Sequence, residues 1–378
     1  MGLMSGRWRL PETVVVPLQA LARGLATGRA PGIEVERVRA ALAALPLRWL
    51  MIAEMEVGHL LDMRGPPTQS GRQTRDLDLL RLTPGLEYPF LFHKSGYCRE
   101  AALRKLGGQP PATFWTAAIA YRQNDWVEPV RKAACDCVSR LFPLLAPEVM
   151  AEAAYFLLTR MPMWGRWQLE PKVPPDGLLL EQAEVAAALA HHIGRATSGP
   201  AGAVLRQALR QPGLDGHLPA LAIDAVQPIV RLVALHTLIE GAAIWPDGHE
   251  REIVNKPYQI YREVPVFARR PIIRPGSSSV YLDMAARDRS VIVRRLAAAT
   301  LAKQLGRTET ESWMEHEPVL TLLERDPDKS IRDRIAFIRR FLHQGPPTLV
   351  QALEALCSPG TPEPVRDRDL GRDVELLD

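Results

Sequence analysis

The chain has 378 residues, of which 47% are hydrophobic and only 6% aromatic, and its formal charge of +4 is the difference between 47 basic and 43 acidic side chains. This length exceeds that of an ordinary single-core globule and the charge balance excludes a polycationic surface, so we expect two or three domains or one array of repeats. The 33 prolines favour many short helices over a few long ones.

Several classes of protein lack support in the sequence. No phosphate-binding, dinucleotide-binding or zinc-protease motif is present, so we predict no enzyme, no catalytic residues and no cofactor. The cysteines form no CxxC pair and have no histidines at zinc-ligand spacing, which predicts free thiols and no metal site. No apolar run approaches the roughly 20 residues of a membrane span, and residues 1–10 lack a signal-peptide core. We therefore expect a cytoplasmic protein with no membrane partner.

Residues 1–82 read as a helical N-terminal region. Apolar residues recur at helical spacing in three segments, 11–25, 33–44 and 47–63, which Gly and Pro separate. A polar, Gly- and Pro-rich stretch at 65–74 predicts a loop. We interpret residues 1–82 as a cap over the end of an array, because the pattern that organises the rest of the chain is absent here.

From residue 84 onwards one pattern recurs: an apolar residue, an arginine, a variable position and two small or apolar residues. The arginines of the five copies, the last a looser one, are Arg99, Arg131, Arg231, Arg294 and Arg332. Three copies have an aspartate six residues before the arginine, namely Asp125, Asp288 and Asp326, whereas His93 takes that place in the first copy. Repetition of this kind predicts one structural unit used several times.

Each copy begins a second helix, and the segment before it has the pattern of a first helix. Residues 114–123, 279–287 and 318–325 are such first helices, and each ends just before the aspartate. The repeated unit of helix, Asp-containing turn and helix resembles the HEAT family of armadillo-type α-solenoids. The resemblance implies an all-α fold, a right-handed α-solenoid over residues 84–343. Two degenerate units are expected between Arg131 and Arg231, with helices at 147–160, 178–193 and 202–209.

The repeated arginines allow two interpretations. An aspartate before a helix can accept hydrogen bonds from its first turn, and the arginine can reach an aspartate of the same or the neighbouring unit. In that case the arginines hold the array together, and this is the interpretation we favour. The alternative is a ladder of arginines that faces a ligand.

Residues 245–279 interrupt the array between two good copies. Five prolines exclude a continuous helix, so we predict an extended insertion with a short hairpin around residues 258–267. The insertion interleaves aromatic and basic side chains that could bind an acidic protein or a phosphate backbone; these candidate binding residues are Tyr258, Tyr261, Phe267, Arg269, Arg270 and Arg274. The alternative is a loop packed along its own array, with its arginines in solvent.

Two further segments depart from the repeat. Trp164 and Trp167 flank a Gly-Arg pair and form either a recognition patch or the anchor of a loop. Residues 345–378 begin with Gly-Pro-Pro and end in a charged run, which predicts a final helix at 349–356 and a partly disordered tail.

The sequence favours a scaffold that binds partner proteins through the array and the 245–279 insertion, as one subunit of a bacterial assembly. The alternative is a nucleic-acid-binding array that uses arginines of the last repeats, such as Arg295, Arg334 and Arg339. Some HEAT-like proteins are alkylpurine DNA glycosylases that use tryptophans and an aspartate. Trp115, Asp125 and Trp126 offer those residue types, although no family motif matches around them. The oligomeric state is left open.

Overall fold

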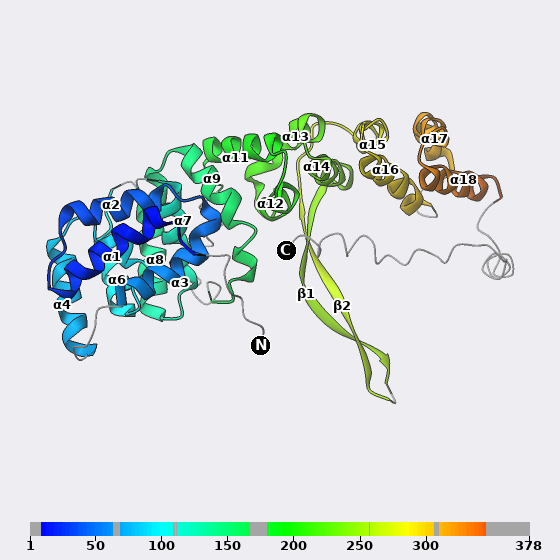
Figure 1. The fold of residues 1–378 in the computed structure, drawn as a ribbon. Coiled ribbons are helices and arrows are strands. Elements are labelled where there is room, and N and C mark those ends of the chain that lie inside the picture. Colours follow the sequence, from blue (N-terminus) through cyan, green and yellow to red (C-terminus); the bar gives the residue numbers. More distant parts are fainter. Residues whose placement is uncertain are drawn as a thin grey trace. The chain divides into compact units, whose positions relative to one another are not determined.

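The protein is described here from a computed structural model, in which residues 9–62, 69–108, 110, 112–166, 180, 182–256, 258–305 and 310–344 are placed. These residues are mostly helical, and they include one two-stranded sheet (Figure 1). The chain divides into two compact units, residues 1–278 and residues 279–378.

The first unit begins with the helices α1 (Glu12–Ala26), α2 (Gly32–Ala43), α3 (Leu50–Asp62) and α4 (Gln69–Leu82). Helix α1 packs against α2 and α3, and both α2 and α3 also contact α7, a helix of the repeated region. An ion pair between Glu54 of α3 and Arg122 adds to this packing. The loop predicted at 65–74 is wrong from residue 69 onwards, because α4 starts there and buries Asp76 and Leu80 against the neighbouring helices.

Two layers of helices follow in the first unit. The first helices of the pairs are α5 (Glu87–Phe90), α7 (Thr113–Tyr121), α9 (Pro147–Leu157), α11 (Ala183–Arg195) and α13 (Leu218–Asp224). The second helices are α6 (Gly96–Lys105), α8 (Glu128–Leu141), α12 (Ala201–Ala208) and α14 (Pro228–Glu240). First helices pack on first helices, as α7 does on α9 and α9 on α11, and second helices pack on second helices, as α6 does on α8 and α12 on α14.

The burial of α7 and α8 follows from their sequences. Helix α7 is apolar around its circumference except at Thr116, and every residue from Phe114 to Ala120 is buried. Helix α8 buries only one stripe, which includes Val130, Ala134, Val138 and Leu141, and leaves charged side chains on the opposite side. Helix α7 therefore lies inside the unit, whereas α8 lies at its surface.

The insertion forms a long β-hairpin. Gly241 ends α14 with a φ of 65°, a conformation that favours glycine, and strand β1 (Ala242–Asn255) follows at once. It pairs antiparallel with β2 (Ile260–Pro271), with a bulge between Pro246 and His249. Figure 1 shows the two strands leaving α14 as a twisted ribbon that extends beyond the helices around its base. The regular hairpin is thus longer than the one predicted at 258–267.

The second unit contains two helix pairs. It includes α15 (Ser278–Ala286) from its second residue onwards, then α16 (Val291–Gln304), α17 (Glu317–Glu324) and α18 (Lys329–Gln344). Helix α18 packs against both α16 and α17. The helix predicted at 349–356 and the predicted tail lie outside the described residues.

Candidate functional site

The five repeated arginines make the same backbone contact. Each guanidinium donates from Nη1 to the carbonyl oxygen of the residue six positions earlier, over distances between 2.6 and 3.1 Å. The pairs are Arg99 with His93, Arg131 with Asp125, Arg231 with Ala225, Arg294 with Asp288 and Arg332 with Asp326. Each arginine therefore satisfies a carbonyl in the turn that precedes its own helix.

The turn residue supplies a second shared contact. Oδ1 of Asp125, Asp288 and Asp326 accepts the backbone N–H two residues later, at 2.9, 2.7 and 2.8 Å respectively. In the first copy Nδ1 of His93 accepts the N–H of Ser95 in the same way, at 3.0 Å. The histidine thus reproduces the acceptor role of the aspartate, a substitution that the sequence pattern registered only as a mismatch.

Arginine and aspartate also link successive helix pairs. Nε and Nη2 of Arg99 both lie 2.7 Å from the carboxylate of Asp125, which belongs to the following turn. In the second unit Arg294 binds Asp326 of the following turn in the same two-pronged way, at 2.6 and 3.2 Å. The predicted reach between neighbouring units is confirmed for these two pairs, and the contacts match arginines that hold helices together.

The three residues named for a glycosylase-like site differ in their exposure to solvent. Trp115 is fully buried and Trp126 is exposed, with the guanidinium of Arg99 over its ring. Asp125 is buried, and its carboxylate binds Arg122 at 3.0 Å as well as Arg99. Asp125 therefore presents no open carboxylate to a substrate.

The predicted arginines of the insertion hold the base of the hairpin. Arg270 forms a two-pronged ion pair with Asp215, both bonds at 2.7 Å, and donates to the carbonyls of Leu209 and Gln211. We call this set of contacts the hairpin clasp. It ties β2 to the end of α12 and to the short helix that precedes α13.

Arg274 and Arg269 bind the end of α14. Nη1 of Arg274 donates to the carbonyls of Leu238 and Ile239, and Arg269 donates to the carbonyl of Glu240 at 3.1 Å. These carbonyls lie in the last turn of the helix, where they have no partner within the helix. All three predicted arginines of the insertion therefore contact their own chain.

The aromatic residues of the insertion differ from its arginines, because they face solvent. Along β2, Tyr261, Glu263, Pro265, Phe267 and Arg269 are exposed, whereas the alternate residues from Val264 to Arg270 are half-buried. This alternation of two is that of a strand with one face towards solvent. One side of the ribbon thus carries exposed side chains over much of its length.

The residues of β1 that oppose these side chains complete a surface that we call the outward face. From base to tip it consists of four directly opposed pairs: Pro246 with Phe267, His249 with Pro265, Arg251 with Glu263, and Ile253 with Tyr261. Ile253, Tyr261 and Phe267 are 52%, 53% and 58% exposed, which is high for large apolar side chains.

The sequence analysis missed the β1 half of the outward face. The signal that could have found it is the enrichment of β-branched and aromatic residues from Tyr261 to Phe267, which indicates a strand and therefore requires a partner strand. Tyr258 lies at the turn of the hairpin and is also exposed. It stands beside Gln259, whose φ of 50° marks the tight reversal of the chain.

The two tryptophans predicted as a patch have different outcomes. Trp164 is buried, with its ring against Tyr121 at a centroid distance of 5.4 Å, as expected for the anchor of a loop. Trp167 lies outside the described residues.

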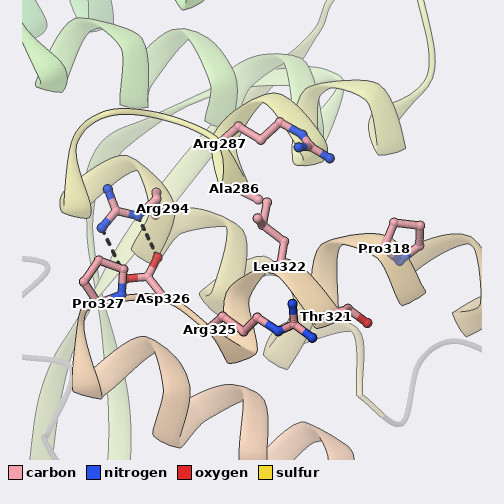
Figure 2. Close-up of a pocket in the computed structure, with 9 residues that line it drawn as sticks. All are labelled: Ala286, Arg287, Arg294, Pro318, Thr321, Leu322, Arg325, Asp326 and Pro327. Atoms are coloured by element: carbon pink, nitrogen blue, oxygen red, sulfur yellow. Dashed lines mark hydrogen bonds and ion pairs between the residues drawn. The ribbon is translucent and has the colours of Figure 1, made fainter.

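The second unit has a shallow depression between its helices (Figure 2). Its volume is about 680 Å³, and Figure 2 shows Leu322 pointing toward Ala286. The ion pair of Arg294 with Asp326 closes one edge, and Arg287 on the rim binds Asp283. Its lining charges are therefore largely paired within the chain.

Charge pairing also shifts the titration of the second unit. Burial would raise the pKa of Asp326, but hydrogen bonds from Arg294 and from the N–H of Asp328 outweigh it and hold that pKa below its usual value. The hydrogen bond to Asp326 in turn raises the pKa of Arg294. In the first unit burial raises the pKa of the Cys137 thiol to about 11, so this free thiol is protonated at neutral pH.

Two of the three arginines named for phosphate binding are engaged within the second unit. Arg295 binds Asp328 at 2.8 Å, and Arg339 binds both Glu317 and Glu324.

No described helix combines the length and the apolar character needed to cross a bilayer. Within the described residues, no three His, Cys, Asp or Glu side chains gather as a metal site would require.

Comparison with known proteins gives no assignment. No protein-family model, curated protein or solved structure matches this chain.

Proposed function

We propose that the chain is a right-handed α-solenoid scaffold related to the HEAT repeats, and that it binds a partner protein through the outward face of the β1–β2 hairpin. The solenoid assignment draws support from the repeated Arg–Asp turns and from the packing of first helices on first helices and second helices on second helices. Free cysteines, among them the buried Cys98 and Cys137, fit a cytoplasmic location.

One observation carries the functional proposal: large apolar side chains of the hairpin face solvent on a ribbon that extends beyond the helices. A solvent-exposed two-stranded ribbon has no core of its own. Burial of its exposed Tyr, Phe and Ile side chains against a partner would lower the free energy and so stabilise the complex. Tyrosine and phenylalanine are also enriched at the centres of protein interfaces.

The charges of the hairpin favour a protein over a nucleic acid. A phosphate backbone needs several cations that are free to neutralise it. Arg269, Arg270 and Arg274 donate to their own chain, and Arg262 pairs with Glu252 at 2.7 Å. The hairpin thus offers apolar contact area with few unoccupied positive charges.

The test compares the intact chain with a variant that combines Tyr261→Ser and Phe267→Ser. Both chains are tagged, crosslinked in the native host beside the untagged native chain and purified, and the recovered proteins, the untagged chain included, are quantified by mass spectrometry. We expect the double variant to lose specific partners. Tyr97→Ser is the matched control, because Tyr97 is a similarly exposed aromatic residue on α6.

The proposal is wrong if the double variant recovers the same proteins as the intact chain. A titration with duplex DNA and single-stranded RNA at two salt concentrations covers the alternative. Tight binding that weakens steeply with salt would favour nucleic acid as the partner.

A further inference from the structure

We infer that the protein bound by the outward face is a second copy of this chain, with the two hairpins packed face to face about a twofold axis parallel to the strands. This inference rests on the proposed function of the hairpin and names its partner. The observation behind it is the order of the opposed pairs along the face.

The four opposed pairs of the outward face follow one another along the ribbon, and we call each pair a level and the pair of Arg251 with Glu263 the charged level. Near the base Pro246 opposes Phe267, and near the tip Ile253 opposes Tyr261, so both ends of the face are apolar. Between them Arg251 of β1 stands directly opposite a residue of opposite charge, Glu263 of β2. Each level thus has one member on each strand.

A twofold axis along the ribbon places β1 of one copy over β2 of the other at the same level. The rotation turns one outward face onto the other and exchanges the positions of the two strands. Arg251 then meets Glu263 of the second copy, and Glu263 meets Arg251 of the second copy. By the same operation Phe267 meets Pro246 and Tyr261 meets Ile253. The contact is the same in both directions, as an isologous interface requires.

The charged level singles out a second copy from other proteins. Within the described residues neither the side chain of Arg251 nor that of Glu263 makes a hydrogen bond or an ion pair, although both are exposed and opposed across the ribbon. On the opposite side of the ribbon the next pair, Glu252 with Arg262, is bonded within the chain at 2.7 Å. The outward face therefore holds one free cation and one free anion at one level, which is the arrangement that an identical face complements.

The other side of the ribbon is less suited to this role. Val264, Val266 and Ala268 are half-buried there, and near the base the ring of Trp245 lies under the guanidinium of Arg210. The β1 strand also contacts α12 and α14. A face-to-face dimer would therefore use only the outward face.

The experiment reverses one charge at a time. In R251E both residues of the charged level are acidic, and in E263R both are basic, so each variant opposes like charges in its own dimer. In an equimolar mixture of the two variants every contact between different copies pairs an acid with a base. We expect each variant alone to weaken dimerisation at least tenfold and the mixture to restore it as the mixed species.

Sedimentation velocity at about 1 to 100 µM, concentrations that detect association of micromolar affinity, measures dimerisation of the full chain. Native mass spectrometry with one variant isotope-labelled identifies the mixed dimer. The matched controls are E252R and R262E, which make the same changes on the opposite side of the ribbon and should dimerise like the wild type. Circular dichroism and hydrogen exchange of α7 and α14 check that each variant is folded.

A wild-type chain that stays monomeric throughout this range overturns the inference, and so does a mixture that fails to recover the dimer. If the wild type is monomeric but the Tyr261 and Phe267 double variant loses its captured partners, the proposed function stands with a different protein as partner. If the double variant also captures the same partners as the intact chain, both proposals are wrong.

Discussion

The turns between the helices bury charged side chains, whereas the outward face of the hairpin exposes apolar and charged ones. In the turns, buried guanidinium groups and carboxylates are bonded to each other, as Arg99 and Asp125 are. On the hairpin, apolar and charged side chains face solvent, as Phe267 and Arg251 do. The repeated residues therefore satisfy the chain's own polar groups, whereas the segment that occurs once carries the exposed side chains that we propose a partner covers.

This contrast also separates two kinds of arginine that the sequence presents alike. Arg270 and Arg251 both lie in the β-hairpin, but Arg270 is bound to Asp215 and two carbonyls, while the guanidinium of Arg251 forms no hydrogen bond or ion pair with a described residue. Their expected responses to mutation differ accordingly. Variants in the turns and in the clasp should change stability, and variants on the outward face should change association.

The largest effect is expected for Asp125→Ala. The variant removes the carboxylate that binds two buried guanidinium groups, and leaves Arg99 with backbone carbonyls and Arg122 with Glu54 as the remaining partners. Loss of one partner from a buried ion pair costs about 3 to 5 kcal/mol of unfolding free energy. Urea denaturation measures it. Asp78→Ala is the control, because Asp78 pairs with exposed Arg81 and should cost less than about 1 kcal/mol.

A smaller effect is expected for Arg270→Met, which deletes the hairpin clasp and keeps a similar side-chain length. Hydrogen bonds to charged groups contribute about 1.5 to 3 kcal/mol. We expect faster hydrogen exchange at the base of β1 and β2, with little change in α7. Arg262→Met removes an exposed pair on the same hairpin and serves as the comparison. Equal exchange in both variants would show that the clasp does not hold the hairpin.

The pH dependence of the second unit should follow Asp326. Because its pKa is lower in the folded chain than in the unfolded one, its contribution is complete above pH about 4 and is lost as pH falls through the folded pKa. Asp326→Asn should be less stable than the wild type at pH 7 and lose less stability between pH 4 and 2. Hydrogen exchange of α16 and α18 reports on this unit. Parallel pH profiles for the two proteins would contradict the prediction.

The smallest stability effect is expected for Phe267→Ser. More than half of this side chain is already in solvent, so the unfolding free energy should change by less than about 0.5 kcal/mol. Phe114→Ala is the contrast, because Phe114 is buried in α7 and its truncation should cost about 3 to 5 kcal/mol. Thermal unfolding compares the two. A large loss of stability in Phe267→Ser would mean that the outward face packs against the chain itself.

The helical part could be predicted because its signals are local. Apolar spacing gave first helices within a few residues of α7, α15 and α17, and the turn pattern gave the Arg–Asp pairs. The role of His93 could not be read, because accepting an N–H from Ser95 depends on the orientation of its ring rather than on its charge.

The hairpin and its clasp were harder to predict for physical reasons. Prolines such as Pro246 and Pro265 usually argue against a strand, but both strands of a two-stranded ribbon are edges, where a missing N–H is tolerated. The partner of Arg270 is Asp215, which lies 55 residues earlier in the chain, and no local sequence pattern indicates that the two residues meet. Sequence alone therefore placed Arg270 in a binding surface, whereas the folded chain uses it internally.

The hairpin clasp has a mechanical consequence. A ribbon joined to the body only at Gly241 and residue 272 could swivel about those two backbone connections. Arg269 holds the ribbon to the end of α14, and the guanidinium of Arg270 adds attachments to Asp215 and to Leu209, which follows α12 of the preceding pair. A pull on the ribbon is consequently shared between neighbouring helix pairs, so the arm can carry a load while keeping its angle to the first unit.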